Sequence, residues 1–132
     1  MNKTIIQQNW GLVNDYNLPF IFSKMDCGIV SLNRFANTSN IPGKFVSYVQ
    51  FGLPIICFAK MSSSLSKLIL KYKCGIVIDL SDSQNSNKQK LFLFLKNFKL
   101  AKKSLSINSY KLFIENFDSK AIANQILRGK YV

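Results

Sequence analysis

The segment 40–56, NIPGKFVSYVQFGLPII, constrains the fold of this chain more than any other part of it. Pro42 has no N–H group and a fixed φ angle, and both properties suit the start of a helix. Apolar residues recur through 44–51 at the spacing of one buried helix face, and Gly52 can adopt the left-handed conformation that ends a helix. The apolar run 54–58 then predicts a strand. Loop, helix, stop and strand in this order indicate one unit of an α/β sheet.

Short apolar runs and helical patterns alternate along the rest of the chain. The predicted strands are 4–8, 27–32, 54–58 and 76–78, and the predicted helices are 18–24, 44–51, 65–72, 88–98, 105–116 and 121–127. Such alternation favours a parallel sheet flanked by helices. With 132 residues, 48% of them apolar, the chain is long enough for one packed core. The predicted fold class is therefore α/β, Rossmann-like, with a single domain over 1–132.

The net charge of +12 is concentrated in the second half of the chain. No acid occurs between Ser83 and Ile114, where the lysines are Lys88, Lys90, Lys96, Lys99, Lys102, Lys103 and Lys111. A basic surface attracts nucleic acid, anionic lipid head groups or nucleotides, although a codon bias toward Lys and Asn is an alternative explanation. Arg, the residue suited to bidentate contacts with bases, occurs only at Arg34 and Arg128, so sequence-specific nucleic-acid reading is not expected. In the predicted helix 88–98, the residues expected to face inward are Leu91, Phe92, Leu95 and Phe98.

The chain contains no His, and its three cysteines, Cys27, Cys57 and Cys74, have no CxxC spacing. A Ser–His or Cys–His pair cannot form within it, and no metal site or cofactor is expected. We interpret the cysteines as small core residues of a protein in a reducing, cytoplasmic setting. No apolar run approaches the ~18 residues that a membrane span requires.

The start of the predicted helix 44–51 also has the composition of a phosphate-binding corner. Gly43 lets backbone approach a ligand, and open N–H groups of the first turn carry partial positive charge beside Lys44. The preceding polar loop 33–41 follows the strand 27–32, and parallel sheets bind ligands at the carboxyl ends of their strands. Because any α/β domain has similar corners, a corner without a ligand remains the alternative.

Four segments together resemble the C-terminal domain of GT-B glycosyltransferases. NIPGKFVSYVQFGLPIIC at 40–57 resembles its phosphate corner, with closest similarity to the L-fucosamine-transferase-like group of bacterial O-antigen and capsule synthesis. MDCGIVSL at 25–32 resembles its acidic-residue-then-strand segment, CGIV at 74–77 its Gly-then-strand segment, and FDS at 117–119 the start of its last helix. The resemblance covers the chain from about Ile5 to Leu127.

The resemblance implies a truncated GT-B C-terminal domain that binds a nucleotide-diphosphate-sugar donor such as a UDP-sugar, without a metal. Carried over by position, the residues near the sugar and the diphosphate are Thr38, Ser39 and Asn40. The phosphate corner is formed by Pro42, Gly43 and Lys44, and the residue that faces the ribose is Ser47. Many retaining members carry a pair of Glu where Ser39 and Ser47 stand in this chain.

The resemblance also implies an incomplete enzyme, because GT-B proteins carry the acceptor on an N-terminal domain that this chain lacks. We therefore expect the donor-binding part of a hexosyltransferase-type glycosyltransferase in lipopolysaccharide or capsule synthesis, with a separate N-terminal GT-B half as its partner. The expected location is the cytoplasm, with peripheral attachment to the anionic inner face of the plasma membrane. Two alternatives stay open: a noncatalytic basic module that docks on anionic membrane or RNA, and a decayed fragment without activity.

Overall fold

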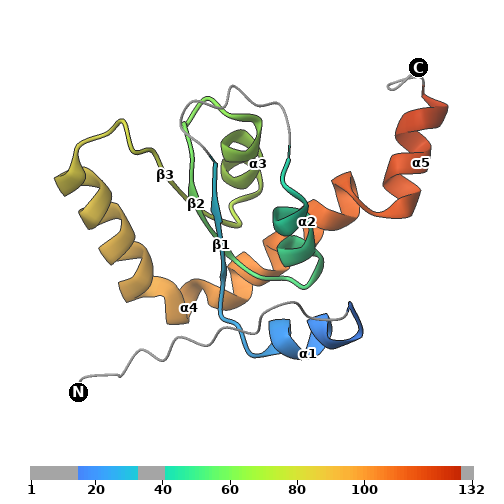
Figure 1. Cartoon of the computed structure of the whole chain (residues 1–132), viewed down its shortest axis with the longest axis horizontal. Helices are drawn as coiled ribbons and strands as arrows, with labels where there is room; N and C mark the ends of the chain where they lie inside the picture. The colour runs from blue at the N-terminus through green and yellow to red at the C-terminus, as the bar shows by residue number, and fades with distance from the viewer. Residues whose placement is uncertain (1–14, 33–40, 129–132) are drawn as a thin grey trace.

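The computed structural model describes residues 15–32 and 41–128 (Figure 1). In chain order the elements are η1 (Asp15–Asn17), α1 (Leu18–Ser23), β1 (Gly28–Ser31), α2 (Gly43–Gln50), β2 (Ile55–Phe58), α3 (Ser64–Tyr72), β3 (Gly75–Ile78), α4 (Gln84–Asn116) and α5 (Ser119–Leu127). Strands and helices alternate, which confirms the α/β class. The strand predicted at 4–8 and the loop residues 33–40 lie outside the described residues.

The three strands form an open parallel sheet in the order β1-β2-β3. The first residues of the three strands are in register, since Ile55 of β2 pairs with Gly28 of β1 and with Gly75 of β3. Because the strands run in the same direction, their carboxyl ends share one edge of the sheet, and α2, α3 and α4 follow from that edge (Figure 1). We call it the carboxyl edge. The arrangement is compatible with a Rossmann-like fold.

The core lies on one face of the sheet, under α2, α3 and the C-terminal part of α4. Its fully buried helix residues include Phe45 and Val49 of α2, Leu65 and Ile69 of α3, and Leu112 of α4. The pairs in α2 and α3 have the four-residue spacing of one helix face, so hydrophobic burial alone accounts for the orientation of both helices.

Helix α4 is continuous from Gln84 to Asn116, whereas the sequence analysis predicted two helices, 88–98 and 105–116. The connecting residues 99–104 include no Gly or Pro, and Lys, Leu and Ala favour a helix, so nothing interrupts it. Figure 1 shows that α4 changes direction along its length. We call residues 84–98 the first arm and residues 105–116 the second arm.

The two arms differ in burial. In the first arm Leu91 and Phe98 are half-buried, but Phe92 is 64% exposed and Leu95 54% exposed, so the prediction that all four face inward is wrong for these two. Within the described part of the chain, the first arm packs with one of its sides. Lys90 lies on that side, and its ammonium donates a hydrogen bond to the carbonyl oxygen of Val77 at 3.2 Å.

The second arm is attached to the turn that joins α2 to β2. Gly52 of this turn has a φ of 69°, the left-handed conformation expected from the sequence. Ser106 Oγ donates to Gly52 O at 2.5 Å, and Ser109 Oγ donates to Leu53 O at 2.8 Å. Since the two serines are one helical turn apart, both hydroxyls face the turn while Leu112 enters the core.

Candidate functional site

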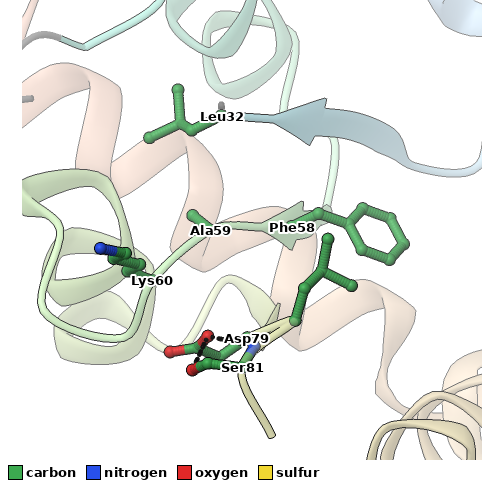
Figure 2. Close-up of a pocket in the computed structure, with 7 residues that line it drawn as sticks. Leu32, Phe58, Ala59, Lys60, Asp79 and Ser81 are labelled. Carbon is green, nitrogen blue, oxygen red and sulfur yellow. Dashed lines mark hydrogen bonds between the residues drawn. The ribbon is translucent and has the colours of Figure 1, made fainter. Parts of the chain in front are cut away.

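A cavity of about 180 Å³ opens at the carboxyl edge (Figure 2). The residues that line it follow or end the three strands: Leu32, Phe58, Ala59, Lys60, Asp79, Leu80 and Ser81. In Figure 2 the Phe58 ring and the Lys60 ammonium point to opposite sides. The cavity therefore combines apolar walls with a few polar groups, at the position where parallel sheets bind their ligands.

Asp79 is the acidic residue of this cavity, and hydrogen bonds fix its carboxylate. Oδ2 accepts from the Met61 N–H at 2.9 Å, and Oδ1 accepts from both the hydroxyl and the N–H of Ser81 at 2.6 and 2.9 Å. These bonds, with the Ser81 hydroxyl as the largest contribution, lower the pKa of Asp79. A carboxylate with both oxygens engaged and a lowered pKa is a weak base, so Asp79 serves to hold the loops after β2 and β3 together.

A second hollow of about 290 Å³ shares Phe58 and Leu80 with this cavity and extends it toward the start of α4. Its other lining residues are Ile78, Asp82, Gln84, Asn87, Lys88 and Leu91. Asn87 Nδ2 donates to Asp79 O at 3.0 Å, while Asn87 Oδ1 is buried and has no hydrogen-bond partner among the described residues. The hollow thus offers an ammonium, a carboxylate and an unpaired amide oxygen beside apolar side chains.

Helix α2 also begins at the carboxyl edge, and its N-terminus differs from those of α3 and α4. In those two helices Ser63 and Ser83 occupy the N-cap, and each hydroxyl accepts a hydrogen bond from the backbone N–H three residues later. In α2 the N-cap is Pro42, which has no side-chain acceptor, and the first helical residue is Gly43. Pro42 thus lies one position before the first turn, and it leaves the first N–H groups of α2 without a cap from its own side chain.

Four of the predicted donor residues, Pro42, Gly43, Lys44 and Ser47, belong to this N-terminus or to the helix that follows it. Gly43 and Lys44 are exposed, and a Cβ placed on Gly43 would meet no atom of residues 15–32 and 41–128 within 4 Å, so the described part of the chain leaves the space in front of the turn open. Lys44 Nζ lies 5.9 Å from the centroid of the Tyr48 ring, and Ser47 is half-buried. None of Pro42, Gly43, Lys44 and Ser47 lines the cavity. Thr38, Ser39 and Asn40 lie outside the described residues.

The six lysines of the predicted basic patch differ in their contacts. Lys88 lines the second hollow, Lys90 is bonded to the sheet, and Lys102 forms an ion pair with Asp26 at 2.6 Å. The remaining three lysines, Lys96, Lys99 and Lys103, are exposed on α4. Two of the six lysines, Lys90 and Lys102, therefore have partners within the protein.

Two of the three cysteines, Cys57 and Cys74, are buried in the core, as we expected for all three. Burial raises the pKa of the Cys57 thiol to about 12 and that of Cys74 to about 11, whereas Cys27 is half-buried.

Within 15–32 and 41–128 there is no group of three or more His, Cys, Asp or Glu residues that could hold a metal ion. The same part of the chain includes no helix that is both long and apolar enough to cross a membrane.

Lys60, Asp79 and Ser81 were not predicted from the sequence as site residues. The sequence feature that could have indicated them is their position, because polar residues directly follow the apolar strands 54–58 and 76–78. Such residues meet at one edge when the strands are parallel.

Comparison with protein-family models, curated proteins and solved structures gave no match for this chain. The resemblance to GT-B glycosyltransferases therefore rests on the residues of the corner and its flanking segments.

Proposed function

We propose that this chain binds a nucleotide-diphosphate-sugar donor at the carboxyl edge, as the C-terminal domain of a GT-B glycosyltransferase does. The observation that carries the proposal is the uncapped, exposed start of α2 at the Pro42–Gly43–Lys44 corner. The first turn of a helix presents N–H groups with a total partial charge of about +0.5, which favours phosphate oxygens. The space that the described residues leave open at Gly43 is suited to such a group.

In this proposal the two parts of the donor occupy different parts of the edge. The diphosphate contacts the N–H groups of Gly43 and Lys44, and the Lys44 ammonium moves from the Tyr48 ring toward it. The sugar enters the cavity, where its C–H faces pack on Phe58 and its hydroxyls meet Lys60. Sugars are commonly held by such mixtures of apolar and polar groups.

In this proposal the chain supplies the donor site and not the catalytic groups. Three of its acids are engaged, since Asp26 pairs with Lys102, Asp79 accepts three hydrogen bonds, and Glu115 accepts one from Tyr72. We infer that a separate N-terminal GT-B half brings the acceptor and the catalytic groups. The proposed setting is hexosyl transfer in bacterial lipopolysaccharide or capsule synthesis in the cytoplasm.

The test is thermal unfolding of the full chain with UDP, with pyrophosphate and with uridine. UDP at 100 times its Kd should stabilise the protein by about 2.7 kcal/mol, which raises Tm by roughly 10 °C for a domain of this size. Pyrophosphate and uridine, which each lack part of the ligand, should protect less. A folded protein whose Tm does not change in millimolar UDP would refute the proposal, and equal protection by pyrophosphate would reduce the site to a general anion site.

The informative variant is Gly43→Asp. The new side chain meets open space, and an acid in the first turn of a helix stabilises it by about 0.3–1 kcal/mol, so the variant should fold. Its carboxylate should repel the diphosphate and abolish protection by UDP. The matched control is Ser119→Asp, which adds the same charge at the first residue of α5 and should leave the UDP effect intact.

A further inference from the structure

The face of the sheet opposite the core is exposed at β1. Because side chains alternate along a strand, Val30 points into the core while Ile29 and Ser31 point to the opposite face. Ile29 is 54% exposed, and Ser31 is exposed too. Parallel sheets are generally covered by helices on both faces. The exposure of Ile29 shows that the described helices leave this face, which we call the second face, uncovered at β1.

The first arm of α4 covers the second face at its other side, near β3. Phe58 and Ile78 are in register with Ser31, so their side chains also point to the second face. Together with Leu91 of the first arm, they line the second hollow. The hollow therefore lies between the first arm and β2, the central strand of the sheet.

One flank of the first arm faces the second hollow. Lys88 and Leu91 line the hollow, and Leu95 follows Leu91 by one helical turn, so these three side chains share a flank. Leu95 is 54% exposed. Leu93 is similarly exposed at 55%, but it lies on the other flank, because two residues span more than half a helical turn. The flank at the hollow thus presents an exposed leucine beside an ammonium group.

The surface around the hollow is basic. Lys99 follows Leu95 by one further turn and continues the flank that Lys88 begins. No acid occurs in the sequence from 84 to 113, and the carboxylate among the residues that line the hollow is that of Asp82. A second copy of the chain would bring another net charge of +12, and this repulsion opposes self-association. An acidic partner is attracted instead.

We propose that the second hollow and the second face at β1 dock an amphipathic helix of another protein that carries acidic side chains. A helix suits this position because helices cover the faces of parallel sheets, and docking of a helix in an apolar groove is a common mode of recognition. The apolar side of the partner helix packs on Ile29, Leu91 and Leu95, which removes their exposed surface from water. Its carboxylates lie beside Lys88 and Lys99.

The inference does not depend on donor binding. None of these five residues belongs to the Pro42–Gly43–Lys44 corner or lines the cavity at the carboxyl edge. The test is run without nucleotide, so it can succeed or fail separately from the test with UDP.

The experiment is fluorescence anisotropy of a labelled synthetic peptide titrated with the full chain. The peptide has about 18 residues, enough to form a helix, with leucines along one side and glutamates beside them. One control peptide has lysines in place of the glutamates, and another has the same residues in an order without a leucine stripe. The glutamate peptide should bind at least about tenfold more tightly than either control, and its binding should weaken with salt. Equal binding of the glutamate and lysine peptides, or no binding of the glutamate peptide, would overturn the inference.

Two leucine variants of the first arm test the apolar contact. Leu95→Gln should weaken binding of the glutamate peptide roughly fivefold, since it removes an apolar side chain that the partner covers. The matched control is Leu93→Gln, which makes the same change at similar exposure on the other flank and should leave binding unchanged. Gln is a good helix former, so both variants should fold. Equal losses in the two variants would contradict the assignment to the flank at the hollow.

The basic contact is tested by replacing Lys88 and Lys99 by Gln, which should weaken binding roughly threefold for each lysine. The control replaces Lys67 and Lys71, which are exposed on α3 at the core side of the sheet, and should have a much smaller effect. Similar losses in both double variants would reduce the interaction to general attraction by net charge and refute the docking site. A dimer in analytical ultracentrifugation that Leu95→Gln dissociates would assign the surface to a second copy and overturn the inference.

Discussion

Replacing Ser109 by Ala should destabilise this protein more than replacing Ser106 by Ala, although both hydroxyls donate to backbone carbonyls of the same turn. Ser109 is completely buried and its Oγ lies 2.8 Å from Leu53 O, whereas Ser106 is half-buried beside Gly52 O. Water can replace the lost hydroxyl at the half-buried position but not at the buried one. The two variants therefore differ in what happens to the acceptor that remains.

The expected magnitudes follow from this difference. A buried carbonyl that loses its hydrogen-bond donor lowers the free energy of unfolding by about 1–3 kcal/mol. The better helix propensity of Ala raises it by up to about 0.5 kcal/mol. Ser109→Ala should thus lower the free energy of unfolding by roughly 1–2.5 kcal/mol. At Ser106 the net hydrogen bond contributes about 0.5–1.5 kcal/mol, and the same propensity gain offsets part of it, so the loss should be roughly 0–1 kcal/mol.

The assay is urea unfolding followed by far-UV circular dichroism, with the m value checked for constancy. Ser104→Ala is the control, because this exposed residue of α4 has the same propensity gain without a buried hydrogen bond. Its unfolding free energy should be unchanged or slightly higher than that of the wild type. The reasoning would be refuted if Ser109→Ala matched Ser104→Ala, or if the Ser106 and Ser109 variants lost equal stability.

Two further predictions concern the sheet and its carboxyl edge. In Gly28→Ala the new Cβ would overlap the Tyr48 ring, and such overpacking should cost about 1–3 kcal/mol. Adding Tyr48→Ala removes the ring, so the double variant should lose less stability than the sum of the single losses, and strict additivity in urea unfolding would contradict the contact. Hydrogen bonds from Ser81 and Met61 lower the pKa of Asp79 in the folded state, so its contribution is present above the ordinary Asp pKa and is lost as pH falls through the folded value. The stability difference between the wild type and Asp79→Asn should therefore shrink from neutral pH to about pH 2, and a pH-independent difference would count against this role.

Sequence patterns predicted the strands and the helices that pack on the sheet well, because the apolar residues at regular spacing in these elements are the residues that the fold buries. Phe45, Tyr48 and Val49 have the spacing of one helix face, and all three are buried on one face of the sheet. The strand predicted at 54–58 is β2 with one residue fewer. In this region a side chain's neighbours in space follow from its position in the chain.

The same reasoning was wrong for the first arm of α4. Helical spacing shows that side chains such as Phe92 and Leu95 can share a face, but it does not show that another element covers that face. The division into two helices was also wrong, because the polar residues between the two predicted helices include no helix-breaking residue. Polarity indicates exposure, and an exposed segment can still be helical.

One part of the candidate site could also be predicted from the sequence, and another part could not. The helix start at Pro42, Gly43 and Lys44 could be predicted because these residues are consecutive in the chain, and phosphate binding there stays a prediction. The cavity could not, because strands far apart in sequence supply its walls, and Asp79 accepts a hydrogen bond from Met61, which lies 18 residues earlier. Only the parallel pairing of the strands brings these groups together.

The attachment of the second arm has a consequence for synthesis on the ribosome. The sheet is complete once Ile78 has been made, but its core face is closed by Leu112 and by the hydroxyl of Ser109. At about 5–20 residues per second, the ribosome needs some seconds to extend the chain from Ile78 to Leu112. During that interval the apolar face of the nascent sheet has no cover from α4, so a pause in translation within this stretch would prolong the period in which the chain is most prone to aggregate.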